Sequence, residues 1–293
     1  MSELWQRLMT TPQGALPLGD WVNALIRMLM DHNGGAFDAI GSVVEGLAAS
    51  VEAMLLALPV WMLMGVFVAL GLWRLSWRFA VFVLGAFGLI YVMGFWHQTV
   101  STLALTLSAT CLSLLLGVPV GIWCARSNVA NVMVRPVLDF MQTMPAFVYL
   151  IPAAMFFGLG RVPGILATVV FAIPPAVRLT SLGIRQVNTE QVEAGQAFGC
   201  SAWQLLLKVQ LPIALPAIMA GVNQTIMMAL SMVIIASMVG AGGLGNDVLS
   251  SIQRLDVGLG YESGLAVVLL AIVLDRITES FGKGMAARQS RAD

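Results

Sequence analysis

The chain has 293 residues, of which 59% are apolar and only 10% charged, and its formal net charge at pH 7 is zero. Soluble domains carry about 25% charged residues, so this composition excludes a water-soluble globule and indicates an all-α polytopic membrane protein. There is no basic run that would favour nucleic acid as a partner. Three cysteines give no disulfide framework.

Residues 1–53 are mixed in polarity, and 1–17 have no apolar core of the length that a cleavable signal peptide needs. The segments 18–32 and 37–57 place acids and amides opposite an apolar helical face, which predicts amphipathic helices at the membrane interface. A soluble helix that folds back on the membrane spans is an equal alternative for this region.

Seven apolar segments follow, each near the roughly 20 residues that a helix needs to cross about 30 Å of hydrocarbon. They cover residues 54–73, 79–95, 99–123, 136–158, 163–182, 213–239 and 263–281.

The basic residues predict the orientation of these spans, because Lys and Arg gather on the cytoplasmic side. With seven spans, the N-terminus is expected outside and the C-terminus inside, and segment 240–262 lies outside. Eleven of the 15 basic residues then share the inner side: Arg74, Arg78, Arg126, Arg135, Arg178, Arg185, Lys208, Arg276, Lys283, Arg288 and Arg291.

The longest polar interruption in the later part of the chain is the segment 188–212, which is predicted to form two short cytoplasmic helices. Asn188 can cap the first helix and Gly199 can end it, because glycine adopts the left-handed conformation without steric cost. Ser201 and Gln204 have the spacing of a capping box at the start of the second helix. Pro212 suits the first turn of the span that follows.

The same segment resembles the EAA loop of binding-protein-dependent ABC importer permeases. The pattern is Glu193-Ala194-Gly195, three residues, Gly199, nine residues, and Val209-Gln210-Leu211-Pro212, with Gly195 and Val209 departing from the usual Ala and Ile. An ordinary helix–turn–helix loop between spans is the alternative. The resemblance implies a coupling helix that docks on an ATPase subunit through Glu193, Ala194, Gly195, Phe198, Gly199, Leu211 and Pro212.

Three further stretches, 135–164, 210–245 and 274–278, are similar to permeases of the glycine betaine/proline importer family. This resemblance implies a type I permease core over 97–282, two accessory spans over 54–96 and a cytoplasmic tail over 283–293. It also implies a bacterial inner-membrane complex with a second copy of the chain, two ATPase subunits and a periplasmic or lipid-anchored binding protein. The implied cargo is a compatible solute or quaternary amine: glycine betaine, proline betaine, choline or proline, with another small polar solute as the alternative.

No catalytic residue is predicted. Gly282-Lys283 lacks the upstream glycine and the hydroxyl residue of a P-loop, and no His or Cys pattern has metal-ligand spacing. We therefore expect a non-catalytic subunit without a cofactor or metal of its own, with ATP and Mg²⁺ bound by the partner ATPase.

Neutral polar and aromatic side chains within the spans are the candidates for a translocation path, because amides and hydroxyls in lipid must face protein or water. A purely structural role, in which these side chains only hold neighbouring helices together, is an equal alternative. Asp139 is expected in the first turn of its span, and Asp275 in a local ion pair with Arg276. The absence of a proton relay disfavours an ion-coupled secondary transporter, and the loop disfavours both a channel and a transport-inactive scaffold. The path candidates are Gln142, Thr143, Met144, Phe147, Tyr149, Asn223 and Ser231.

Overall fold

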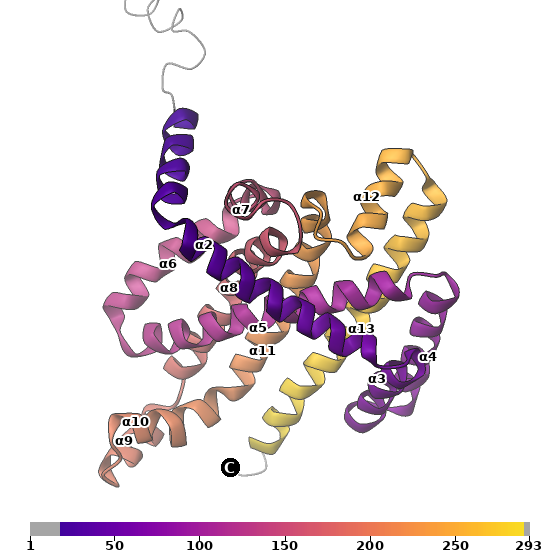
Figure 1. The fold of residues 1–293 in the computed structure, drawn as a ribbon. Helices are drawn as coiled ribbons and strands as arrows, with labels where there is room; N and C mark the ends of the chain where they lie inside the picture. Colours follow the sequence, from indigo (N-terminus) through magenta and orange to yellow (C-terminus); the bar gives the residue numbers. More distant parts are fainter. Residues whose placement is uncertain (1–17, 290–293) are drawn as a thin grey trace, which may run out of the picture.

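The computed structural model describes residues 18–289, and the described chain is a bundle of α-helices with short 3₁₀ and π segments (Figure 1). The predictions for residues 1–17 and 290–293 lie outside the described residues. The elements in order are α2 (Leu18–Ala57), α3 (Val60–Arg74), α4 (Trp77–Val92), α5 (Trp96–Arg126), α6 (Asn128–Thr143), η1 (Ala146–Tyr149), α7 (Leu150–Phe157), α8 (Arg161–Arg185), α9 (Thr189–Ala197), α10 (Ala202–Leu205), η2 (Leu206–Gln210), α11 (Leu211–Ala236), η3 (Ser237–Val239), α12 (Leu244–Arg254) and α13 (Val257–Gln289).

Within residues 18–289, five helices are long and apolar enough to cross a membrane, and a bent pair could supply a sixth span. This count differs from the seven expected. Helices α3 and α4 have 15 and 16 residues and reach only about 23 Å at 1.5 Å per residue, which is shorter than the hydrocarbon layer. The span expected over 54–73 is also interrupted, since α2 ends at Ala57 and α3 begins at Val60.

The N-terminal region forms the two helical segments that were predicted, and they meet end to end in α2. Helix α2 is continuous over 40 residues apart from a kink at Asn33, and its part from His32 to Ala57 passes the length and hydropathy test for a span. It lies across α5, α7 and α8 (Figure 1). Phe37 stacks on Phe156 with ring centroids 4.8 Å apart, so the helix is fastened to the bundle.

Helix α8 is the centre of the bundle, because it packs extensively on both α5 and α11. Small residues make these contacts close: a Cβ on Gly117 would lie 2.8 Å from Cβ of Ala176, and one on Gly183 would lie 2.8 Å from Cβ of Ala217. Small residues at helix crossings are the usual device for close packing in membranes.

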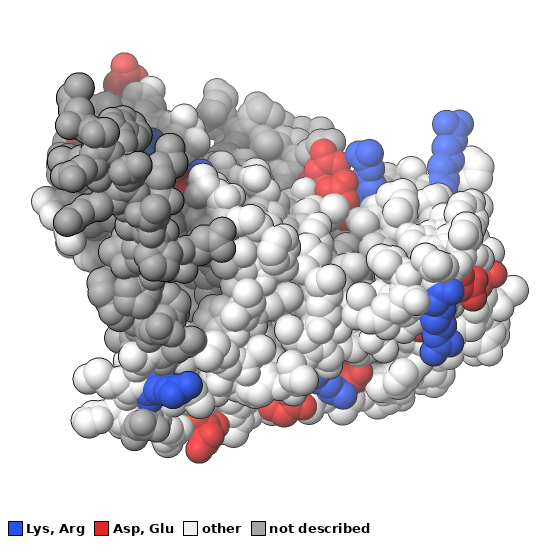
Figure 2. Space-filling model, turned by 90° about the horizontal axis from the view of Figure 1, so that it is seen from above, with Lys and Arg blue, Asp and Glu red and all other residues white. Residues whose placement is uncertain are grey.

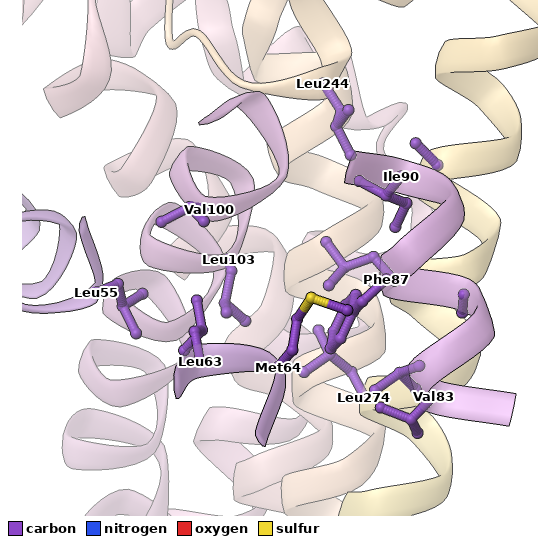
Figure 3. Packing of buried hydrophobic residues seen from close by; sticks show 14 of the residues in the cluster. Leu55, Leu63, Met64, Val83, Phe87, Ile90, Val100, Leu103, Leu244 and Leu274 are labelled. Carbon is purple, nitrogen blue, oxygen red and sulfur yellow. The ribbon is translucent and has the colours of Figure 1, made fainter. Parts of the chain in front are cut away.

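A cluster of buried apolar side chains joins the accessory helices α3 and α4 to the rest of the bundle (Figure 3). Phe87 of α4 and Leu103 of α5 are both almost fully buried in it, as is Leu274 of α13. The hairpin α3–α4 is therefore packed against α5 and α13, and it does not form a separate unit.

The expected continuous span over 136–158 is wrong. Helix α6 begins at Asn128 and ends at Thr143, and the α6 and α7 axes differ by 109°. Pro145 has φ −56° and ψ 134°, and Met144 before it takes the extended conformation that a following proline favours. Asp139 consequently lies near the end of α6, not in a first helical turn, and it pairs with Arg178 of α8.

Among the described residues visible in Figure 2, uncharged side chains predominate, and the charged ones are scattered. Large exposed apolar side chains such as Trp61, Val92 and Leu116 occur on several helices. An apolar exterior of this kind fits a bilayer as solvent.

Candidate functional site

Helices α9 and α10 project at one end of the bundle, and α12 lies at the opposite end (Figure 1). Helix α9 begins as predicted, because the Asn188 side chain accepts a hydrogen bond from the backbone N–H of Glu190 at 3.0 Å. It ends at a left-handed Gly199 with φ +75°. The N–H of Cys200 donates to the carbonyl of Gly195 and that of Gly199 to the carbonyl of Gln196, which is the Schellman arrangement.

The second helix begins with the predicted capping box. The Ser201 hydroxyl accepts from the N–H of Gln204 at 3.3 Å, and the Gln204 side chain accepts from the N–H of Ser201 at 2.9 Å. Each bond satisfies an N–H that the helix itself leaves unpaired. The direction in which the chain leaves the α9–α10 corner is therefore fixed by local hydrogen bonds.

Pro212 lies in the first turn of α11, as predicted, but no break in the helix precedes it. The chain stays helical from Ala202 to Val239, and the π segment η2 connects α10 to α11. In a regular helix the proline ring would clash with the carbonyl four residues earlier. The wider π turn gives this ring room, and π segments are frequent at functional sites. Helices α10 and α11 are consequently parts of one continuous helix, Ala202–Val239, which acts as a lever.

Gly195, the departure from the family pattern, lies buried where α9 crosses α10. A Cβ at this position would meet Cδ1 of Leu205 at 2.7 Å. The absence of a side chain thus allows the close approach of the two short helices, and Leu205 fills the space.

The outer face of the loop combines polar and large apolar groups. Glu193 and Ala194 are exposed, Phe198 is 89% exposed and Trp203 is 60% exposed. Trp203 was not among the predicted site residues, although the capping box fixes its helical position and could have revealed it. Exposed aromatic side chains around a carboxylate suit a protein partner better than water.

Leu211 and Pro212 differ in environment. Leu211 packs against a buried cluster that includes Ile184 and Leu206, so it anchors the lever, while Pro212 is exposed. At the end of α8, Arg185 donates to the carbonyl of Cys124 at 2.6 Å and to Oδ1 of Asn128 at 2.9 Å. The helix that enters the loop is therefore fixed to the α5–α6 turn.

Five predicted path residues lie at the α6–α7 bend. The Tyr149 hydroxyl donates to the carbonyl of Met141 at 2.7 Å and thereby braces the bend. Thr143 donates to the carbonyl of Phe140, Gln142 and Met144 are half-buried, and Phe147 is 57% exposed.

Asn223 lies elsewhere, between α11 and α13. It lines a cavity of about 540 Å³ together with Gln224, Met227 and Glu279, and none of the α6–α7 residues line that cavity. Its amide donates to Asp275 at 3.1 Å, and the hydroxyl of Thr278 donates to its oxygen.

The expected Asp275–Arg276 pair is therefore wrong. Asp275 bonds to Asn223, and Arg276 pairs with Glu279 at 3.2 Å. The polar residues thus join two spans. Ser231 is exposed, and its hydroxyl bonds to its own helix at Met227.

Comparison with known proteins identifies the family. The model for "Binding-protein-dependent transport system inner membrane component" matches residues 117–290. The glycine betaine/carnitine transport permease of Listeria monocytogenes is 46% identical over 272 residues, covering 92% of this chain and 96% of the relative. The glycine betaine/proline betaine transport permease of Escherichia coli is 46% identical over 277 residues, which cover 94% of this chain and 78% of the relative.

A solved structure of an inward-facing methionine ABC transporter has the same fold, with a TM-score of 0.58, 22% identity and coverage of 63% of this chain and 92% of that one. The expected permease architecture is thus confirmed, and the protein is a multi-pass component of the bacterial inner membrane. The chain belongs to the binding-protein-dependent transport system inner membrane components, the permeases of ABC importers.

Proposed function

We propose that this chain is the permease subunit of an ATP-driven importer for glycine betaine or a related quaternary amine. The carnitine and proline betaine named for its relatives belong to the same chemical class, which is a permanent cation on a small carboxylate. Two copies of the chain enclose the path, two ATPase subunits dock on the loop around Glu193 and Gly199, and a separate binding protein delivers the cargo.

The α9–α10 corner is the observation that carries the proposal. Its caps hold Glu193, Phe198 and Trp203 on an exposed face, and the lever α10–α11 leads from that face directly to Asn223. Motion of the ATPases can thus reach the spans through a continuous helical segment. The chain itself carries out no hydrolysis and holds no cofactor in this proposal, since ATP and Mg²⁺ belong to the ATPase.

Transport then follows alternating access. The two ATP states of the ATPase dimer have different affinities for two positions of the coupling loops, and only such a difference in affinity shifts a conformational equilibrium. One position opens the path to the binding protein, and the other opens it to the cytoplasm.

Uptake in cells tests the substrate class. A bacterial strain without other osmolyte importers would express this chain with its ATPase and binding protein, and uptake of radiolabelled glycine betaine, choline and proline would be compared. We expect saturable uptake of a quaternary amine that requires all three components. Uptake of an unrelated solute alone would contradict the substrate class but keep the family.

A further inference from the structure

A charged cavity lies between α5, α6 and α8, at the end of α8 that leads into the coupling loop. Its volume is about 450 Å³. The charged and polar side chains that line it are Asn131, Arg135, Asp139, Arg178, Ser181 and Arg185. Three guanidinium groups thus face one carboxylate, and no predicted path residue lines this cavity.

The arginines differ in how firmly they are held. Arg185 is fixed to the carbonyl of Cys124 and to Asn128. Arg178 pairs with Asp139, but their side chains are 38% and 61% exposed. Within residues 18–289, Arg135 forms no ion pair. Exposed ion pairs contribute about 0–1 kcal/mol, so the Arg178–Asp139 pair opens at little cost.

This arrangement matches a dipolar ion. A carboxylate that enters the cavity can replace Asp139 on Arg178, with Arg135 beside it, and the released Asp139 can then face a quaternary ammonium. The exchange replaces one opposite-charge pair by two and leaves the net charge of the cavity unchanged. A phosphate group fits less well, because its second negative charge meets the Asp139 carboxylate at close range.

We propose that this cavity is a weak inner-side site for a zwitterion that carries a carboxylate and a quaternary ammonium, occupied on the way to the cytoplasm. The inference rests on the proposed function for its cargo. Helix α8 forms one wall and runs into the coupling loop, so movement of the loop changes the cavity. A weak site of this kind suits release, because the binding protein supplies the affinity on the outer side.

Direct binding tests the site. The permease–ATPase complex, without binding protein and in nanodiscs of phosphatidylcholine, would be titrated with radiolabelled glycine betaine in equilibrium dialysis. We expect saturable binding in the millimolar range. Arg178→Gln is expected to weaken it about tenfold or more, whereas Arg178→Lys, which keeps the charge, retains part of it. The matched control is Arg254→Gln, an exposed arginine on α12 at the other end of the bundle.

Competition separates the possible occupants. Choline carries the cation without the carboxylate, so it is expected to compete weakly with wild-type protein and to lose this effect in Asp139→Asn. Displacement of glycine betaine by lower concentrations of inorganic phosphate, or by phosphatidylglycerol in the nanodisc, would identify an anion or lipid site and overturn the proposal.

Absence of saturable binding, or equal binding by Arg178→Gln and wild type, would also overturn it. Co-purification of the ATPase with each variant shows that the complex is assembled. ATP-driven uptake of a quaternary amine by wild type, together with unchanged binding in the variants, would refute the cavity site alone. Failure of wild-type uptake for every quaternary amine would instead refute the proposed function.

Discussion

Gly199 ends α9 at φ +75°, a conformation that costs most L-residues about 1–2 kcal/mol. We expect Gly199→Val to distort the Schellman turn and to lower uptake by about tenfold or more, while the complex still assembles and hydrolyses ATP. Gly199→Asn is the matched control, because asparagine tolerates the left-handed region. Uptake and ATPase rates in the same proteoliposomes measure this uncoupling, and normal uptake by correctly inserted Gly199→Val would contradict it.

Glu193 is exposed on the same loop, so its replacement leaves the fold of the corner intact. We expect Glu193→Lys to reverse the charge that faces the ATPase and to lower uptake strongly at unchanged thermal stability. Glu190→Lys, in the first turn of the same helix, is the comparison. Co-purification of the ATPase with each variant reports docking, and equal recovery with equal uptake would argue against a docking role for Glu193.

Gly195 sets the distance between α9 and α10. Because the neighbouring atom is the far end of the flexible Leu205 side chain, Gly195→Ala is expected to reduce uptake by no more than about twofold, whereas Gly195→Leu abolishes it. Overpacking of such a contact costs about 1–3 kcal/mol. Restored uptake in the double variant Gly195→Ala, Leu205→Val would support the contact, and full activity of Gly195→Leu would contradict it.

Asp247 in the first turn of α12 has one carboxylate oxygen that is buried without a hydrogen-bond partner among residues 18–289, and burial raises the pKa of its carboxyl. The folded protein therefore holds this proton more tightly than the unfolded chain, so stability falls as pH rises through the raised pKa. We expect Asp247→Asn to raise Tm by about 1 °C at pH 7 and to lose this advantage near pH 4. Differential scanning fluorimetry at the two values measures it; an equal effect at both would exclude a charge origin.

Helices α9 and α10 could be predicted from the sequence because their caps are local. Asn188, Ser201 and Gln204 bond to groups within three residues, and the spacing alone specifies those bonds. The break after Thr143 could not be predicted, because Met144-Pro145 lies in an apolar run that a kinked span would also contain. The Tyr149–Met141 bond that braces it depends on the bend itself.

The contacts between spans could not be predicted from the sequence for a different reason. Asn223 and Asp275 are 52 residues apart, and Asp139 and Arg178 are 39 apart. A single sequence does not show which helices meet or which faces they turn to each other. Composition therefore indicates a membrane protein, but not the cavities between its helices, and the orientation from the basic residues stays a prediction.

At the scale of the whole molecule, the α9–α10 corner lies at one end of the bundle and α12 at the other (Figure 1). The continuous segment Ala202–Val239 lies between them. A domain that moves at the corner can thus act on the opposite end through one continuous helical segment. In the proposed function, this movement is driven by ATP and powers uptake.

Uptake of radiolabelled glycine betaine into proteoliposomes that contain this chain, its ATPase and its binding protein tests that claim most directly, with and without internal ATP. We expect uptake that requires both ATP and binding protein and persists when ionophores abolish ion gradients. Uptake without ATP that follows a sodium or proton gradient would contradict it and would leave the capped loop without a coupling role.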